Sequence, residues 1–264
     1  MITNILKDKP TRVFIILAGI FVANALIAEI IGVKIFSLEA TFGMSPVNIL
    51  IFGDAYSFNM TAGVLLWPVV FIMTDIINEY FGVKGVRFLS YLTAALIAFA
   101  FIIFYIAIRL EPAAFFVTSK VEAGVPDMDV AYGQILGQGS MIIIASLTAF
   151  LLGQLVDVFT FHKIKKMTGE GKIWLRATGS TLVSQLIDSF VVLFCAFHLF
   201  PIITGQKGQA WPLGLVISVC IINYIYKFTV AIVLTPVIYW VHGIIERYLG
   251  HDLAAEMKRA AMNR

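Results

Sequence analysis

Charged residues are scarce in this chain of 264 residues: 13% are Asp, Glu, Lys or Arg, whereas 60% are hydrophobic. A soluble domain has about 25% charged and about 45–50% apolar residues. The mean hydropathy of +0.92 agrees with this imbalance. The composition therefore excludes an ordinary soluble domain and indicates an all-α integral membrane protein.

Cysteine and histidine are also rare, with two and four residues respectively. Cys195 and Cys220 both fall inside apolar runs, which excludes a disulfide framework of the secreted type. The histidines are scattered without metal-ligand spacing, and neither a G-x-S-x-G motif nor a phosphate-binding glycine loop is present. We therefore expect no metal, no cofactor and no enzymatic activity.

Six apolar runs have about the length needed to cross a bilayer, which takes roughly 20 residues per helix. They lie at residues 13–33, 62–77, 88–108, 141–161, 178–203 and 213–241. Short connections and a tail at 242–264 account for the rest. The sequence predicts a single transmembrane transporter domain over 1–264, built as a six-transmembrane-helix bundle.

The basic residues between these runs predict an orientation. Fourteen fall on one side and four on the other. The four are Lys34, Arg109, Lys120 and Lys207. The fourteen are Lys7, Lys9, Arg12, Lys84, Arg87, Lys163, Lys165, Lys166, Lys172, Arg176, Arg247, Lys258, Arg259 and Arg264. Because basic residues concentrate in cytoplasmic loops, both termini are predicted to be cytoplasmic.

Four segments outside the spans receive separate interpretations. The basic connector 162–177 is expected to lie among anionic lipid headgroups rather than to bind nucleic acid. In the outer loop 37–61, the apolar piece 47–52 forms either a hairpin or a segment dipping onto the bundle. The outer loop 110–138 is expected to be a solvated connector. The tail forms a helix on the cytoplasmic face, pairs with a second subunit as a homodimer, or remains solvated.

Polar residues inside the apolar runs point to the function. A charge at the bilayer centre costs about 2.5–3.5 kcal/mol on insertion scales, so such residues persist where they face a partner or a pathway. Several lie three or four residues apart, on one face of a helix, and the run 88–108 has no ionisable residue. They suggest a bundle around a small polar cavity. They are Asn24, Glu29, Asp75, Glu79, Gln154, Asp157, Ser184, Gln185, Asp188, Asn223 and Lys227.

Asp188 and Lys227 are the natural opposite charges near the membrane midplane, where Asn24, Gln185 and Asn223 are also expected. They form either an ion pair that locks two helices together or a site whose charges exchange partners when substrate arrives. For Asp75, Glu79, Gln154 and Asp157, the alternative to a site is polarity at the level of the inner headgroups.

Two further observations concern helix breaks and a repeated motif. Trp67-Pro68 and Pro236 are expected to interrupt the second and sixth spans, and Trp67 either stacks on a flat ligand or packs in the core. Residues 153–157 (GQLVD) and 184–188 (SQLID) share their spacing. The predicted spans place Asp157 roughly 6 Å and Asp188 about 15 Å from the inner ends of their helices. Because these depths differ, a chance similarity between the two motifs remains an alternative.

Several blocks of the sequence resemble one known family. They are 66–75 (LWPVVFIMTD) with 79–82 (EYFG) and Arg87, then 152–158 (LGQLVDV), 180–188 (STLVSQLID) and 223–227 (NYIYK). In this order they are similar to the queuosine precursor transporters of the vitamin uptake transporter family, which have six helices. Trp67 departs from the usual Phe before the proline, and the outer loops are longer.

The resemblance implies import of the queuosine precursors 7-cyano-7-deazaguanine (preQ0) and 7-aminomethyl-7-deazaguanine (preQ1) across a bacterial cytoplasmic (inner) membrane. Two alternatives stay open: the substrate-binding subunit of an energy-coupling-factor transporter, and an intramembrane enzyme acting on lipid. Because the sequence has no ATP-binding motif, we expect a facilitator or a proton-coupled carrier, with an intramembrane carboxylate as the proton relay.

Overall fold

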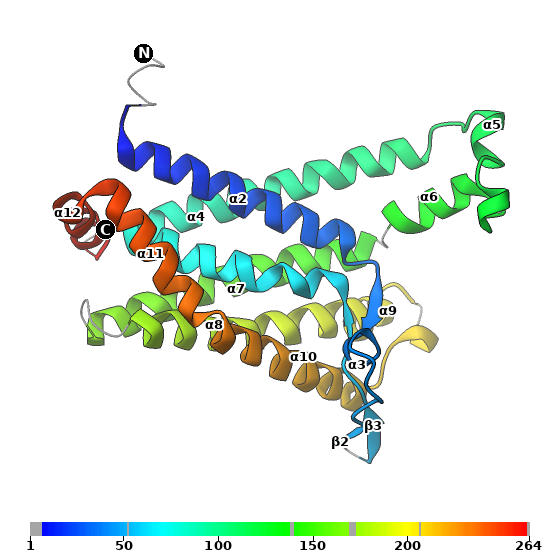
Figure 1. Ribbon diagram of the computed structural model, residues 1–264. Coiled ribbons are helices and arrows are strands. Elements are labelled where there is room, and N and C mark those ends of the chain that lie inside the picture. The colour runs from blue at the N-terminus through cyan, green and yellow to red at the C-terminus, as the bar shows by residue number, and fades with distance from the viewer. Residues whose placement is uncertain (1–6, 52, 138–139, 169–172, 206, 263–264) are drawn as a thin grey trace.

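The computed structural model describes residues 7–51, 53–137, 140–168, 173–205 and 207–262. Within these ranges, five helical runs are long and apolar enough to cross a membrane (Figure 1). They are Lys9–Ile31 (helix α2), Trp67–Ile108 (α4), Ile143–Thr168 (within α7, Ser140–Thr168), Leu182–Ile203 and Leu213–Val233 (α10). The predicted class, an all-α membrane protein, is confirmed.

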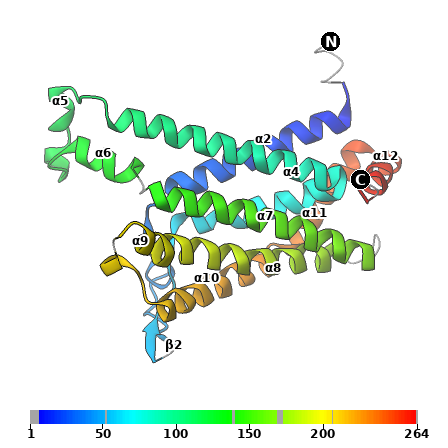
Figure 2. The ribbon, with the colours of Figure 1, turned by 180° about the vertical axis from the view of Figure 1, so that it is seen from behind.

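Helix α4 consists of two segments that meet at Gly82. Gly82 has φ 71° and ψ −175° inside an element of 42 residues, and this conformation is essentially restricted to glycine. Figures 1 and 2 show the two segments turning back on each other at the end of the bundle where α12 lies. The helices predicted at 62–77 and 88–108 are therefore both parts of α4, and their predicted connector is helical up to the bend.

Pro68 begins α4, so the prediction that Trp67-Pro68 interrupts a span was wrong. A 3₁₀ turn, η1 (Ala62–Leu65), precedes the helix, and Pro68 occupies its first turn. The first N–H groups of a helix have no intrahelical acceptor, so the missing N–H of proline costs nothing there.

The fifth predicted span is one continuous helical run with a π segment. It comprises α8 (Ile173–Leu193), the π segment η3 (Phe194–Leu199) and α9 (Phe200–Ile203). Pro201 has no N–H with which to bond the carbonyl of Phe197. That carbonyl instead accepts a hydrogen bond of 2.8 Å from the N–H of Trp211, and the two rings stack with centroids 4.3 Å apart. The π segment therefore fixes the connection to α10.

Pro236 interrupts the sixth predicted span, as expected. Helix α10 ends at Val233, and α11 (Thr235–Leu249) begins with Pro236 in its first turn. Helix α11 continues through residue 242, where the tail was predicted to begin, so that boundary is not marked by a helix end. A further helix, α12 (His251–Met262), packs on the α4 bend. A Cβ at Gly82 would lie 2.9 Å from the carbonyl oxygen of Ala261. The tail is thus helical rather than merely solvated.

The described parts of the loops 37–61 and 110–138, both predicted to be outer loops, lie at the end of the bundle opposite α12 (Figures 1 and 2). Two antiparallel strand pairs lie in and beside the first of these loops, together with the short helix α3 (Leu38–Thr41). The strands are β1 (Ile35–Ser37) with β4 (Asn59–Thr61), and β2 (Ile49–Ile51) with β3 (Asp54–Tyr56). The hairpin alternative for this loop is confirmed. The buried Glu39 accepts the N–H of Phe58 at 2.9 Å, which ties α3 to the strands.

The loop 110–138, predicted to be a solvated connector, has no buried residue in its described part, but it also contains short helices. It contains α5 (Ala114–Val117), the 3₁₀ turn η2 (Val121–Ala123) and α6 (Met128–Leu136). The side chain of Asp127 caps the N-terminus of α6 by accepting the N–H groups of Asp129 and Val130. Such a cap contributes about 1 kcal/mol to a helix. Another 3₁₀ turn, η4 (Lys207–Gln209), lies before α10.

The apolar core lies between α2, α4 and α7. Phe21, Val70, Ile97 and Phe150 are each at most 1% exposed and belong to one cluster. Large apolar side chains such as Phe99 remain exposed on the outside of the bundle, as expected where a surface faces lipid. Helices α7 and α8 pack against each other along their lengths, and most of the polar residues considered below lie at this contact.

Candidate functional site

Asp188 and Lys227 form an ion pair inside the bundle. The Nζ atom of Lys227 on α10 donates to Oδ2 of Asp188 on α8 at 2.8 Å, and the two side chains are 8% and 14% exposed. Asp188 lies at the middle of the helical run Ile173–Ile203, about 22 Å from either end at 1.5 Å per residue. The predicted pairing of opposite charges is confirmed.

The repeated motif is arranged as a reciprocal contact between α7 and α8. Gly153 begins the motif on α7 and faces Asp188, which ends the motif on α8: a Cβ at Gly153 would lie 3.3 Å from Cβ of Asp188. Conversely, Ser184 begins the second motif and donates to Oδ1 of Asp157, which ends the first, at 3.0 Å. Each aspartate therefore packs against the small first residue of the other motif, which relates the two motifs by an approximate two-fold axis.

Asp157 lies deeper than the sequence predicted. Helix α7 continues to Thr168 instead of ending at 161, because the basic segment that follows Asp157 stays helical. The distance from Asp157 to that end of the helix is therefore about 16 Å, not 6 Å. Asp157 is fully buried and sits one helical turn of α8 away from Asp188.

A second carboxylate faces α8 from α4. Ser180 donates to Oδ1 of Asp75 at 3.2 Å, and both side chains are buried. Ser180 and Ser184 are four residues apart on α8, so they lie on one face of the helix. One turn of α8 thus presents hydroxyl groups to Asp75 on α4 and to Asp157 on α7.

Gln154 joins α7 to both segments of α4. Its Oε1 atom lies 2.9 Å from the hydroxyl of Thr74 before the bend and 3.4 Å from the hydroxyl of Ser90 after it. All three side chains are buried. The burial of Gln154, Asp157, Asp75 and Glu79 disfavours the alternative in which these groups only face lipid headgroups.

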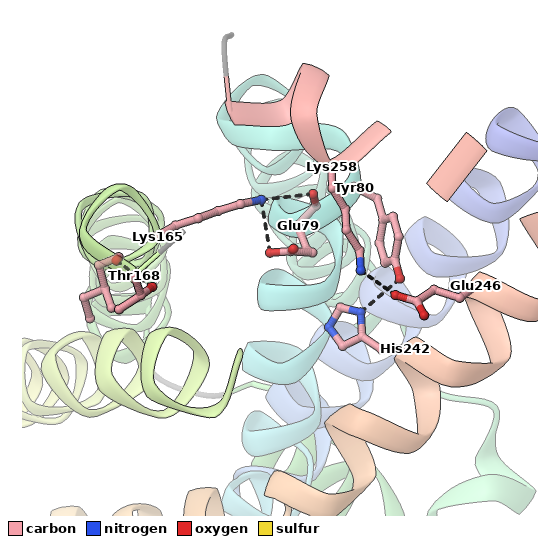
Figure 3. A network of polar contacts seen from close by, with 8 residues as sticks. Glu79, Tyr80, Lys165, Thr168, His242, Glu246 and Lys258 are labelled. Carbon is pink, nitrogen blue, oxygen red and sulfur yellow. Dashed lines mark hydrogen bonds and ion pairs between the residues drawn. The ribbon is translucent and has the colours of Figure 1, made fainter. Parts of the chain in front are cut away.

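Glu79 pairs with a lysine that the sequence assigned to the basic connector. Lys165 reaches from α7 to α4, with Nζ 3.1 Å from Oε2 of Glu79 and 3.4 Å from its carbonyl oxygen (Figure 3). The two side chains are 2% and 1% exposed. For Lys165, the expectation of a position among headgroups was wrong. A buried lysine needs a buried counter-charge, and Glu79 supplies it.

The tail adds polar contacts next to this pair. Tyr80, one residue after Glu79, has its hydroxyl 3.0 Å from Nδ1 of His242 on α11. Lys258 on α12 contacts Glu246 on α11 at 2.5 Å (Figure 3). The hydrogen bond from Lys258 is the main cause that holds the pKa of the Glu246 carboxyl below its ordinary value. These contacts hold α11 and α12 against the α4 bend.

Some buried polar atoms have no hydrogen-bond partner among the described residues. Both side-chain polar atoms of Gln185 are in this state, as are both of Asn78, Nε2 of Gln154 and Oδ2 of Asp157. Leaving such a group unpaired costs about 1–3 kcal/mol. Gln185 and Asp157 flank Asp188 and Ser184 on the α7–α8 contact, so they offer free donors and acceptors beside the ion pair.

Other predicted site residues are engaged elsewhere. The amides of Asn24 and Asn223 donate to carbonyl groups of their own helices, at 2.8 Å and 3.0 Å. The Trp67 ring packs with its centroid 5.6 Å from that of Phe150. Glu29 accepts from Ser146 on α7 at 2.5 Å. The structure therefore brings together Asp157, Ser184, Asp188 and Lys227, with Gln185 next to Ser184 on α8. Gln154 faces α4 instead. Asp75 and Glu79 approach the same helices from α4.

The fold and this site define a class: a multi-pass helical membrane protein with buried charges and amides facing one another between its helices. The sequence profile described as "Putative vitamin uptake transporter" matches residues 61–241, and the chain belongs to this vitamin uptake transporter family.

Curated relatives support the same assignment. The chain is 26% identical over 188 residues to a "Probable queuosine precursor transporter" of Bacillus subtilis, covering 70% of this chain and 73% of the relative. It is also 26% identical over 188 residues to the "Queuosine precursor transporter" of Escherichia coli, with 71% and 72% covered. No solved structure matches the chain. The family and these relatives are transporters, which supports the expectation that the chain is not an enzyme.

The charged and amide site residues could be predicted from the sequence, but most of the residues that bond them could not. Lys165, Thr74, Ser90 and Ser180 were not predicted as site residues. One signal was available: Ser180, Ser184 and Asp188 recur every four residues on one face of α8. Lys165 had no such signal, because a basic run beside a span is already explained by topology.

Proposed function

We propose that this protein imports queuosine precursors, preQ0, preQ1 or both, through a polar site around Asp188 and Lys227. The names of the relatives support the substrate class. The single observation that carries the assignment of the site is the buried Asp188–Lys227 pair beside Gln185, whose amide has no partner among the described residues.

The chemistry of a 7-deazaguanine fits these groups. Its N1–H and 2-amino groups donate along one edge, and a carboxylate such as Asp188 accepts them. Its O6 atom accepts from Lys227 or from the amide of Gln185. Substrate would then satisfy Gln185 and exchange partners with the ion pair. Asp157, Ser184 and Gln154 border the same helix contact, and Trp67 is retained as an aromatic candidate near the start of α4.

Six crossings follow if each segment of α4 crosses separately. A straight helix of 42 residues would be about 63 Å long, twice the thickness of a bilayer core of about 30 Å. The bend at Gly82 divides it into a longer second segment and a shorter first one, which the turn η1 precedes and extends. The start of α2 and the tail lie at one end of the bundle (Figures 1 and 2), as an even number of crossings requires. We assign this end to the cytoplasm of a bacterial inner membrane, from the excess of basic residues.

Purified protein in liposomes tests the proposed function. Labelled preQ0 and preQ1 should each be offered to vesicles that contain only this protein, with protein-free vesicles and excess unlabelled adenine as controls. We expect uptake that unlabelled preQ1 or preQ0 blocks and adenine does not. Binding without uptake would favour a binding subunit that needs an ATPase partner, and turnover of lipid would favour an enzyme. Helix α12 packs against α4 of its own chain. Pairing of two copies through the tail stays a prediction.

A further inference from the structure

The two aspartates of the repeated motif occupy equivalent positions but have different partners. Each packs against the small first residue of the opposite motif, Asp157 against Ser184 and Asp188 against Gly153. Asp188 has the ammonium group of Lys227 at 2.8 Å. Asp157 has no ion pair in the described part of the chain, and its Oδ2 atom has no hydrogen-bond partner there.

This difference decides which aspartate can remain charged when the site is covered. A carboxylate taken out of water without a counter-charge is strongly disfavoured, and it becomes neutral by binding a proton. Asp157 is 0% exposed. The hydroxyl groups of Ser184 and Ser180 face it, but neither supplies a positive charge. Asp188, in contrast, has the ammonium group of Lys227 as its counter-charge.

We propose that Asp157 is the proton-binding group of the carrier and that it takes up one proton when substrate covers the site. This inference rests on the proposed function. When the site is open to water, Asp157 is ionised. Substrate excludes that water, and Oδ2 of Asp157 takes a proton from the side on which the site is open. After the protein opens to the cytoplasm, substrate and proton leave together, and water hydrates the carboxylate again.

Asp157 differs from the carboxylates around it because its buried Oδ2 atom has neither a hydrogen bond nor an ion pair among the described residues. On α2, Glu29 accepts from Ser146. On α4, Asp75 bonds Ser180 and Glu79 is paired with Lys165. On α8, Asp188 is paired with Lys227, and the hydroxyl of Ser180 also faces Asp157. The side chain of Arg176 lies outside the described residues. Because proton and substrate binding are linked, each must change the affinity for the other by the same factor.

The test uses preQ0, because its nitrile, unlike the amine of preQ1, binds no proton near neutral pH. In weakly buffered detergent solution, the full-length protein should take up one proton for each preQ0 bound. Its affinity should fall by up to about tenfold per pH unit on the alkaline side. In liposomes, an inward proton gradient should raise preQ0 accumulation above equilibrium.

In the variant Asp157→Asn, the preQ0 binding that remains should be accompanied by no proton uptake, should not vary with pH and should drive no accumulation above equilibrium. Asp157→Glu, which keeps a carboxyl group, should restore part of the coupling. Glu111→Gln, an exposed change in the outer loop, should behave as wild type. Proton uptake or gradient-driven accumulation that persists in Asp157→Asn would overturn the proposal. If that variant does not fold, preQ0 binding by wild type without any proton uptake would overturn it. A wild-type protein that fails to bind either base would instead refute the proposed function.

Discussion

Lys165 and Glu79 form an ion pair of 3.1 Å with both side chains almost fully buried. The pair joins α7 to α4 three residues before the Gly82 bend and lies beside the tail contacts (Figure 3). A hydrophobic pair of similar volume can be as stable as a buried ion pair, but a single unpaired charge at such a place is strongly unfavourable.

We therefore expect the single variant Lys165→Met to be less stable than the double variant Lys165→Met/Glu79→Gln. Lys165→Met leaves a buried carboxylate without its cation and should destabilise the protein by about 3–5 kcal/mol. The double variant should recover much of that loss, because it leaves no unpaired charge. Thermal unfolding in detergent measures the effect, and Lys166→Met, at an exposed neighbour, is the matched control. A Lys165→Met protein as stable as the control would contradict the buried pair.

The sequence predicted the Asp188–Lys227 pair but not the Lys165–Glu79 pair, for a physical reason. Lys227 is the one charged residue of its apolar run, and a charge in the bilayer needs a counter-charge. Lys165 lies in a basic run, and such runs are common beside spans on the cytoplasmic side. Span positions could be predicted because apolar length is a local property. The extension of α7 beyond 161 could not, since it depends on Glu79 being available to Lys165. A reversal of the chain between 77 and 88 was predicted, but its position at Gly82 was not, because glycine is common in membrane helices.

Gly82 should tolerate no side chain. Its positive φ is strained for any other residue, and a Cβ would come within 2.9 Å of the Ala261 carbonyl oxygen. We expect Gly82→Ala to destabilise the protein by about 1–3 kcal/mol and to increase hydrogen exchange in α12. The control is Gly19→Ala in α2, where a Cβ meets nothing within 4 Å and should be neutral or stabilising. Equal stability of the two variants would show that the bend does not need glycine.

Acid should loosen the tail. The pKa of Glu246 is lowered, mainly by the hydrogen bond from Lys258. A lowered pKa stabilises the docked tail above the ordinary value of 4.5, and this stabilisation is lost as the pH falls through that value and below it. Because the pair is partly exposed, the effect should be below about 1 kcal/mol. Hydrogen exchange of α12 at pH 7 and pH 4, corrected for the intrinsic rate, measures it. Glu246→Gln should remove the pH dependence, and an unchanged dependence would assign it to another group.

The orientation can be tested with single cysteines at exposed positions. Lys166 at the end of α7 and Glu122 in the loop 110–138 are both exposed, whereas Lys165 is buried and unsuitable. In a background without Cys195 and Cys220, a membrane-impermeant thiol reagent added to intact cells should label Glu122→Cys only. Lys166→Cys should react only after the cells are broken. Labelling of both positions from the same side would contradict the single crossing by α7 that separates them.

Equilibrium binding of preQ0 and preQ1 to the purified protein tests the central claim most directly. Asp188→Asn and Lys227→Met should each weaken binding by roughly 10- to 100-fold, the effect of losing a hydrogen bond to a charged group, about 1.5–3 kcal/mol. Gel filtration should show both variants folded, and Glu111→Gln, at an exposed position, should serve as a charge-matched control for Asp188→Asn. If the folded Asp188→Asn and Lys227→Met proteins bind both bases as tightly as wild type, the ion pair only locks α8 to α10 and the substrate site lies elsewhere.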